Sequence, residues 1–217
     1  MQPPEVAQPA RINPSEQDDC ARARLLRAAV EVFDRKGYAA ASVREIVERA
    51  GVAKPALYYH FGSKEGVLLA ILNEATQEFR AAVSRGVEHR GSARDRLVLL
   101  CEGLYSLFMQ NVPVVRVAHA IYFGPREGAP PFDFAVLDRA LDEGIERILP
   151  DGIQRGEVRP AMVNDVAMAL MGAILACTAQ DLHPGVNAAG PAGLGRVLDL
   201  VFDGLLVKRD EKENVTQ

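Results

Sequence analysis

Apolar residues near the start of the chain recur with the period of an α-helix. Leu26, Ala29, Val30 and Phe33 fall at positions i, i+3, i+4 and i+7, and a glycine follows at Gly37. This spacing predicts an amphipathic helix from about residue 22 that ends at the glycine. Residues 1–19 contain several prolines and no apolar period, so we expect a flexible N-terminal tail there.

Two short helices are predicted next. Ser42 and Glu45 have the spacing of a capping box, in which the serine hydroxyl accepts from the glutamate amide and the carboxylate accepts from the serine amide. Gly51 ends the helix that this box starts, and Pro55 suits the first turn of another helix, because proline has no amide to donate. Two short helices joined by a glycine turn predict a helix-turn-helix at about residues 42–62.

The rest of the chain also has helical periodicity, with turn-forming residues between the segments. We expect helices at about 63–84, 93–110, 113–123, 133–155, 164–182 and 191–208. No run of alternating β-branched residues indicates a sheet. The predicted fold class is therefore all-α, with a tail at 1–19, a three-helix domain at 20–66, a larger helical body at 67–210 and a C-terminal tail at 211–217.

Charge is unevenly distributed along this pattern. The whole chain has a formal net charge of −4, yet residues 21–64 hold nine basic and four acidic groups. That segment is therefore +5 and the remainder −9, a division that favours one surface for polyanions and another that repels them. An imbalance of this size over 44 residues can also arise by chance, so charge alone does not decide between the two interpretations.

Lys54 stands at the start of the second short helix, where the helix dipole disfavours a positive charge by a few tenths of a kcal/mol to about 1 kcal/mol. A residue poorly placed for stability suggests a role in binding phosphates or a guanine edge. The alternative is an exposed lysine that the helix tolerates.

Leu57 and Phe61 are expected to occupy the buried face of this helix, so Tyr58, Tyr59 and His60 cannot all be buried with them. Exposed phenol and imidazole groups can donate to phosphate oxygens while their rings contact sugars and thymine methyl groups. The alternative is that a tyrosine, Tyr59 more readily than Tyr58, packs against the neighbouring helix.

With these residues in view, the N-terminal part resembles the tetracycline-repressor (TetR) family of transcriptional regulators. The resemblance covers about residues 22–72 and involves many fixed spacings, carried by Arg24-Leu25-Leu26-Arg27-Ala28-Ala29, Phe33, Gly37-Tyr38, Ser42, Ile46, Ala50-Gly51-Val52, Leu57-Tyr58-Tyr59-His60-Phe61 and Ser63-Lys64-Glu65. Ala53 departs from the serine common in the family, and Val47 from a common alanine, so the operator sequence stays open.

The resemblance implies a three-helix DNA-binding domain and a C-terminal domain that forms a homodimer and binds a small effector. It implies DNA contacts from Ser42 and Arg44, a recognition face of Lys54, Pro55, Ala56, Tyr58 and Tyr59, and phosphate contacts from His60 and Lys64. A two-fold dimer predicts a palindromic operator on double-stranded DNA.

The effector site is expected between helices of the body. Candidates to line it are Phe108, His119, Tyr122, Phe123, Phe134 and Met171, together with Met109, Phe132, Asp133 and Met168; the alternative for most of them is ordinary core packing. The last two predicted helices are expected to form the dimer interface, through one stripe of Ala167, Leu170, Ala173, Ile174 and Cys177 and another of Leu198, Val201, Phe202 and Leu205.

These features predict a ligand-released repressor, with a transcriptional activator or a nucleoid-associated DNA-binding protein as the alternative. No G-x-S-x-G, phosphate-loop or H-E-x-x-H motif occurs, so we expect no catalytic residues and no cofactor. The three cysteines lack zinc spacing, so no metal is expected either. Neither a secretion signal nor an apolar run long enough for a membrane span is recognisable, which favours a cytoplasmic protein.

Overall fold

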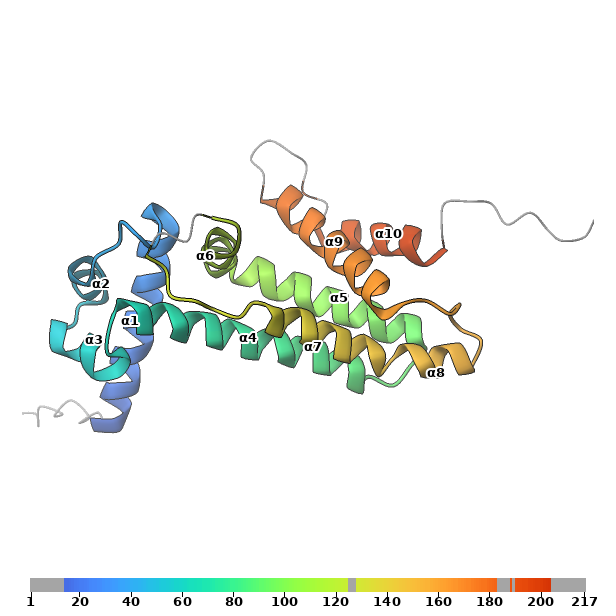
Figure 1. Cartoon of the computed structure of the whole chain (residues 1–217), viewed down its shortest axis with the longest axis horizontal. Coiled ribbons are helices and arrows are strands. Elements are labelled where there is room, and N and C mark those ends of the chain that lie inside the picture. The colour runs from blue at the N-terminus through green and yellow to red at the C-terminus, as the bar shows by residue number, and fades with distance from the viewer. Residues whose placement is uncertain (1–13, 125–127, 183–187, 189, 204–217) are drawn as a thin grey trace, which may run out of the picture. The chain divides into compact units, whose positions relative to one another are not determined.

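The computed structural model describes residues 14–124, 128–182, 188 and 190–203, and the regular structure within those ranges is entirely helical (Figure 1). The prediction of an all-α fold is confirmed. The helices are α1 (Pro14–Lys36), α2 (Val43–Ala50), α3 (Lys54–Phe61), α4 (Lys64–Glu88), α5 (Ala93–Gln110), α6 (Val112–Phe123), α7 (Ala135–Glu146), α8 (Leu149–Gln154), α9 (Val163–Asp181) and α10 (Gly190–Asp203).

The chain divides into two compact units, and the division does not follow the chain order. One unit comprises residues 1–75 and 113–132, and the other comprises residues 76–112 and 133–217. Helix α4 therefore contributes its first half to the first unit and its second half to the second. Helix α6 belongs to the first unit, although the sequence places it within the body.

The first unit is held by a small apolar core. Helix α1 packs on α2 and α3, and its buried face joins Ile46 of α2 and Leu57 of α3. Gly37 and Gly51, which follow α1 and α2, have φ angles of +80° and +62°. A left-handed residue without a Cβ ends a helix at little steric cost, so the predicted stops at both glycines are confirmed.

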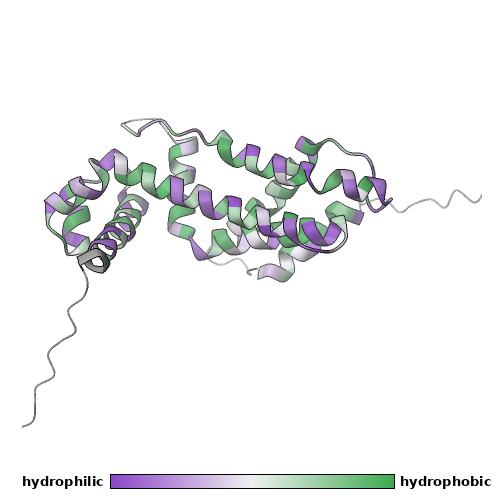
Figure 2. Cartoon of the chain, turned by 90° about the horizontal axis from the view of Figure 1, so that it is seen from below, coloured by the Kyte–Doolittle hydropathy of each residue, from purple (hydrophilic) through white to green (hydrophobic). Residues whose placement is uncertain are grey.

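The second unit has a larger core that involves the second half of α4 together with α5, α7, α9 and α10. Figure 2 shows hydrophilic and hydrophobic bands along these helices, as expected for amphipathic segments that turn one face inward. The fully buried side chains at its centre are Leu97, Leu100, Leu104, Ile145, Ile148, Leu170 and Ile174.

Two helix boundaries differ from the predicted ones. Helix α1 begins at Pro14 rather than at about residue 22, because proline suits a first helical turn and exposed positions such as Asp18, Asp19 and Cys20 need no apolar period. The single helix predicted at 133–155 is broken between α7 and α8, where Pro150 cannot donate a backbone hydrogen bond. The end of the last predicted helix, residues 204–208 with Leu205, lies outside the described residues.

The residues predicted for the dimer interface require a correction. Ala167, Leu170, Ala173, Ile174 and Cys177 of α9, together with Leu198 of α10, are buried in the core of their own chain. They are therefore core residues. The prediction was wrong because α9 is apolar on both sides, so its periodicity does not show which side faces inward. By length and composition alone, α9 is also the one described helix that could cross a membrane.

Candidate nucleic-acid interface

The helix-turn-helix begins at a complete capping box. The Ser42 hydroxyl accepts from the Glu45 amide at 3.3 Å, and the Glu45 carboxylate accepts from the Ser42 amide at 3.1 Å, which confirms the predicted box. Lys36 of α1 also donates to Glu45. The hydrogen bonds from Lys36 and then from Ser42 lower the pKa of Glu45 to about 2. One ionised carboxylate therefore ties the end of α1 to the start of α2.

Helix α3 presents an uncovered face. Leu57 is fully buried and anchors the helix, whereas Tyr58 and Tyr59 are 46% and 77% exposed. Lys54 and Pro55 are also exposed, and the Lys54 ammonium lies 5.7 Å from the centroid of the Tyr58 ring. The aromatic partner of Tyr59 is His60 of the same helix, so packing of Tyr59 on a neighbouring helix does not occur.

Ala56 is half-buried beside this face, at the first turn of α3. On α2, Ser42 and Arg44 are both exposed. The Arg44 guanidinium donates to Glu48 at 2.6 Å, within an ion pair that is largely open to solvent. Exposed pairs of this kind contribute little free energy, so Arg44 can exchange its carboxylate partner for a phosphate at small cost.

Two other residues assigned to phosphates have partners within the chain. The His60 side chain is only 8% exposed, and its Nε2 lies 3.3 Å from an Asp18 oxygen. The Lys64 ammonium donates to the carbonyl oxygens of Tyr38 and Ala41. A role for either residue at phosphates stays a prediction, and this geometry does not favour it.

One set of contacts that stabilises this domain, made by Arg22, was not predicted from the sequence. Arg22 donates to Glu74 of α4 at 2.7 Å, and its guanidinium carbon lies 5.5 Å from the Phe61 ring centroid. The sequence gives no signal for these contacts, because each partner lies about forty to fifty residues away and no motif connects them.

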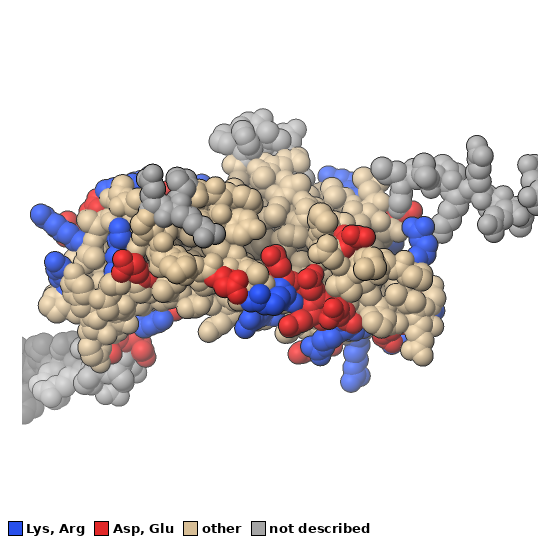
Figure 3. All heavy atoms as spheres, in the orientation of Figure 1, with Lys and Arg blue, Asp and Glu red and all other residues tan. Residues whose placement is uncertain are grey.

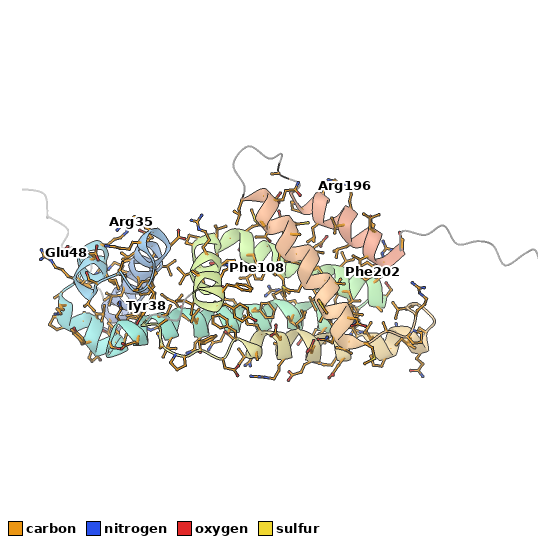
Figure 4. The ribbon with its side chains drawn as sticks, turned by 45° about the horizontal axis from the view of Figure 1, so that its top comes forward. Arg35, Tyr38, Glu48, Phe108, Arg196 and Phe202 are labelled. Atoms are coloured by element: carbon orange, nitrogen blue, oxygen red, sulfur yellow. The ribbon has the colours of Figure 1, made fainter. Side chains whose placement is uncertain are left out.

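Only some of the described basic side chains of this domain are without a recorded carboxylate partner and so available to bind a polyanion. Arg22, Lys36, Arg44 and Arg49 have carboxylate partners, and Figure 3 shows both signs of charge on the surface of the molecule. Arg24, Arg27 and Arg35 are exposed along α1, with Arg35 projecting outward in Figure 4. Together with Lys54, these arginines leave the domain with cations available to a polyanion.

The residues predicted to bind an effector are divided between the two units. Phe108 of α5 (Figure 4) stacks on Phe79 with centroids 6.5 Å apart, and Phe108 and Met171 both pack against the core of the second unit. Phe134, directly before α7, belongs to the same unit. His119, Tyr122 and Phe123 are on α6 in the first unit, where they form an exposed aromatic cluster.

Two of the three cysteines are buried, and no metal site forms among the described residues. Cys101 and Cys177 are buried, and burial raises the pKa of the Cys101 thiol to about 12. A thiol held in its protonated form is a poor nucleophile and metal ligand. Within the described part of the chain, no three His, Cys, Asp or Glu side chains gather as metal ligands would.

This arrangement is that of a helix-turn-helix DNA-binding protein. A capped helix positions a second helix whose outer face carries a lysine and two phenols, the donors that base edges and phosphates accept. A family model described as "Bacterial regulatory proteins, tetR family" matches residues 25–71, which run from within α1 through α2 and α3 into the start of α4. Residues 25–71 are therefore a DNA-binding domain of the tetR type, and the chain is similar to transcriptional regulators that carry this domain.

Relatives of the chain are regulators too. It is 40% identical to the transcriptional activator FasR of Mycolicibacterium smegmatis over 84 residues, which are 39% of this chain and 38% of FasR. It is 26% identical to the fatty acid metabolism regulator protein of Bacillus subtilis strain 168 over 146 residues, 67% of this chain and 74% of that protein. The solved structure of the TetR family regulator PfmR from Thermus thermophilus has a TM-score of 0.71 and 27% identity, covering 86% and 97% of the two chains.

Proposed function

We propose that this protein is a cytoplasmic repressor that binds a palindromic operator as a homodimer and is released by a small molecule with an apolar acyl chain. The observation that carries the proposal is the uncovered face of α3, where Lys54, Tyr58 and Tyr59 project from a helix anchored by Leu57. An α-helix fits the major groove of B-DNA, and its exposed side chains can then contact base edges.

Dimerisation is supported by the outer face of α9. Met168 and Leu175 are 65% and 45% exposed, and the residues that complete this line are also exposed: Ala169, Gly172, Ala176 and Ala179. Water-exposed apolar stripes of this length mark contact surfaces, and the small residues allow a second helix to approach closely. On α10, Leu200 and Val201 are exposed as well. We assign the dimer interface to these faces, which keep Val201 of the predicted stripes and leave out the stripe residues that are buried.

The effector is proposed to carry an apolar acyl chain, and a long-chain acyl-CoA, in which that chain is joined to a charged head group, is the probe to test first. In the second unit, the described buried residues are apolar apart from Thr76, Thr178 and the phenol of Tyr105, and an interior so poor in polar groups suits an apolar chain. The Bacillus subtilis relative, by its name, regulates fatty acid metabolism. Phe108, Phe134 and Met171 of the second unit stay candidate contacts, and His119, Tyr122 and Phe123 of the first unit stay predictions from the sequence.

Ligand release is proposed to act through α4. This helix is continuous from Lys64 to Glu88 and contributes to both units, so a displacement of its second half also displaces the start that follows α3. The ligand can shift the protein between two states only by binding one of them more tightly.

A titration of operator DNA with and without a long-chain acyl-CoA tests the repressor mechanism. Fluorescence anisotropy of an operator duplex is expected to show tight binding by the protein alone and release when the acyl-CoA is added. If calorimetry shows that the acyl-CoA binds the dimer while the operator affinity stays unchanged, the release mechanism fails.

A transcriptional activator is the second candidate function, favoured by the 40% identity with the activator FasR over 84 residues. A promoter-reporter assay separates the two functions, because deletion of a repressor raises transcription from its operator and deletion of an activator lowers it. A nucleoid-associated role would instead give many dispersed binding sites along the chromosome. We propose no enzymatic activity.

A further inference from the structure

We propose that Lys64 is a positioning residue, which ties the first turn of α4 to the segment before α2, and that it does not bind phosphate. The inference rests on the DNA-binding function above and concerns how the helix-turn-helix is held in place. It assigns to Lys64 a role different from the phosphate contact that the family resemblance implies.

The ammonium group of Lys64 is surrounded by partners from its own chain. Its Nζ donates to the Tyr38 carbonyl oxygen at 3.0 Å and to the Ala41 carbonyl oxygen at 2.9 Å. The same nitrogen lies 4.3 Å from the centroid of the Tyr38 ring. Lysine has three N–H donors and no acceptor, so two hydrogen bonds and an aromatic face occupy most of the group.

These partners belong to the segment that joins α1 to α2. Tyr38 is buried and its ring lies 5.3 Å from that of Phe33 in α1. Ala41 donates to the Tyr38 carbonyl at 3.2 Å and directly precedes Ser42, the cap of α2. The Lys64 ammonium therefore fixes the two carbonyl groups that set where α2 begins.

The other end of the tether is the start of α4. Ser63 caps this helix, since its hydroxyl accepts from the Gly66 amide at 3.1 Å, and α3 ends only a few residues earlier at Phe61. One side chain thus connects the end of α3, through the start of α4, to the start of α2. Charge-assisted hydrogen bonds are stronger than neutral ones, so this connection constrains the spacing of the two helices that meet DNA.

A phosphate ligand would show the opposite features, as Lys54 does. Lys54 is exposed, and within the described residues its recorded contact is with the Tyr58 ring at 5.7 Å. It can reach DNA without losing a hydrogen bond. Lys64 could reach DNA only by giving up both hydrogen bonds in a half-buried site, where the Tyr38 oxygen would keep the Ala41 amide as its partner.

The salt dependence of operator binding distinguishes the two roles. Each phosphate that a cation neutralises adds about 0.9 to the slope of log affinity against log salt. We therefore measure full-length wild type, Lys64→Gln and Lys54→Gln by fluorescence anisotropy on one selected operator duplex, over a range of salt concentrations. The proposal predicts that Lys64→Gln weakens binding about tenfold at every concentration with an unchanged slope, whereas Lys54→Gln lowers the slope by about 1 per subunit.

Variants of Tyr38 test the tether without removing the lysine charge. Tyr38→Leu takes away the ring beneath the ammonium, and we expect it to weaken binding with an unchanged slope and to couple with Lys64→Gln in a double-mutant cycle. Tyr38→Phe is the matched control. The Tyr38 hydroxyl is buried without a hydrogen-bond partner, so its removal should leave the operator affinity at the wild-type level.

Two results overturn the proposal. One is a slope that falls by about 1 per subunit in Lys64→Gln while Tyr38→Leu binds as the wild type does, which makes Lys64 a phosphate ligand. The other is a Lys64→Gln variant that has the operator affinity and the melting temperature of the wild type, because Lys64 would then neither position the helices nor bind phosphate. Failure of the wild type to bind every duplex tested would instead overturn the DNA-binding function, and this inference with it.

Discussion

At the scale of single residues, nearby positions on α3 have different roles, one in packing and the other in binding. Leu57 is fully buried and anchors the helix, whereas Lys54, one turn earlier, is exposed at the positive end of the helix dipole. A lysine at that position opposes helix stability by a few tenths of a kcal/mol to about 1 kcal/mol. Its position therefore suits a binding role better than a structural one.

Replacement of Lys54 by alanine should weaken operator binding and slightly stabilise the free protein. If the lysine contacts a base, the loss should be about 1–3 kcal/mol on the preferred operator and smaller on operators changed at one position. Binding measurements on a set of single-substitution duplexes show this pattern. A uniform loss across all duplexes would make Lys54 a phosphate contact, and no loss at all would remove it from the interface.

The capping carboxylate of Glu45 gives the first unit a defined acid sensitivity. Hydrogen bonds from Lys36 and Ser42 lower its folded pKa to about 2, against an ordinary value of 4.5. Its stabilising contribution is therefore complete above the unfolded pKa and is lost as the pH falls through the folded value. We expect Glu45→Gln to flatten the pH dependence of stability between about pH 5 and pH 2, as measured by thermal melting.

Lys36→Gln is the companion variant, because Lys36 is the largest cause of the lowered pKa. It should remove most of the same pH dependence. If the stability of both variants falls between about pH 5 and pH 2 as steeply as that of the wild type, the role assigned to the Glu45 carboxylate is wrong.

The sequence revealed those site residues whose partners are close along the chain. Ser42 and Glu45 are three residues apart, and their capping box is recognisable from the spacing alone. Lys64 contacts carbonyl groups 26 and 23 residues away, and His60 meets Asp18 of a different helix. These contacts within the chain depend on how the helices pack. The sequence alone therefore does not show that Lys64 and His60 have partners other than DNA.

At the scale of elements, close helix packing in the second unit depends on glycine. A Cβ atom built on Gly86 of α4 would lie 2.6 Å from the Leu100 Cβ and 2.9 Å from its Cα in α5. Backbone at that distance cannot move aside without separating the two helices. The apolar periodicity predicted both helices correctly, yet it does not show how closely they approach.

Gly86→Ala should therefore destabilise the second unit by about 1–3 kcal/mol, the usual cost of overpacking. Gly103→Ala is the matched control, because its new methyl group would meet only Ala82, at 3.8 Å or more. In the helix interior the control should gain up to about 1 kcal/mol from helix propensity. Urea unfolding of both variants measures the contrast, and equal stabilities would contradict it.

Helix α9 shows where periodicity alone is insufficient. One of its faces completes the core through Leu170 and Ile174, and the opposite face carries Met168 and Leu175 into solvent. A helix with apolar residues on both sides gives two equally good stripes. Only packing against α5, α7 and α10 decides which stripe is interior, which is why the sequence assigned the core face to the dimer.

At the scale of the whole molecule, the account requires two copies of the chain. Leu175→Arg places a charge on the exposed face of α9 and should give a folded monomer with much weaker operator binding. Leu198→Arg, at a fully buried position, should instead prevent folding, because an unpaired charge in a core is strongly destabilising. Sedimentation and circular dichroism separate these results. A Leu175→Arg protein that stays dimeric would move the interface elsewhere.

Selection of bound duplexes from a random DNA pool by the purified protein tests the central claim most directly. A two-fold dimer with one recognition helix per subunit should enrich a palindrome whose half-sites are centred about one helical turn, ~10 base pairs, or a multiple of it apart. Substitution of Lys54 should change or weaken that consensus. Recovery of no consensus, or of a single asymmetric site bound by one chain, would contradict a dimeric operator-binding regulator.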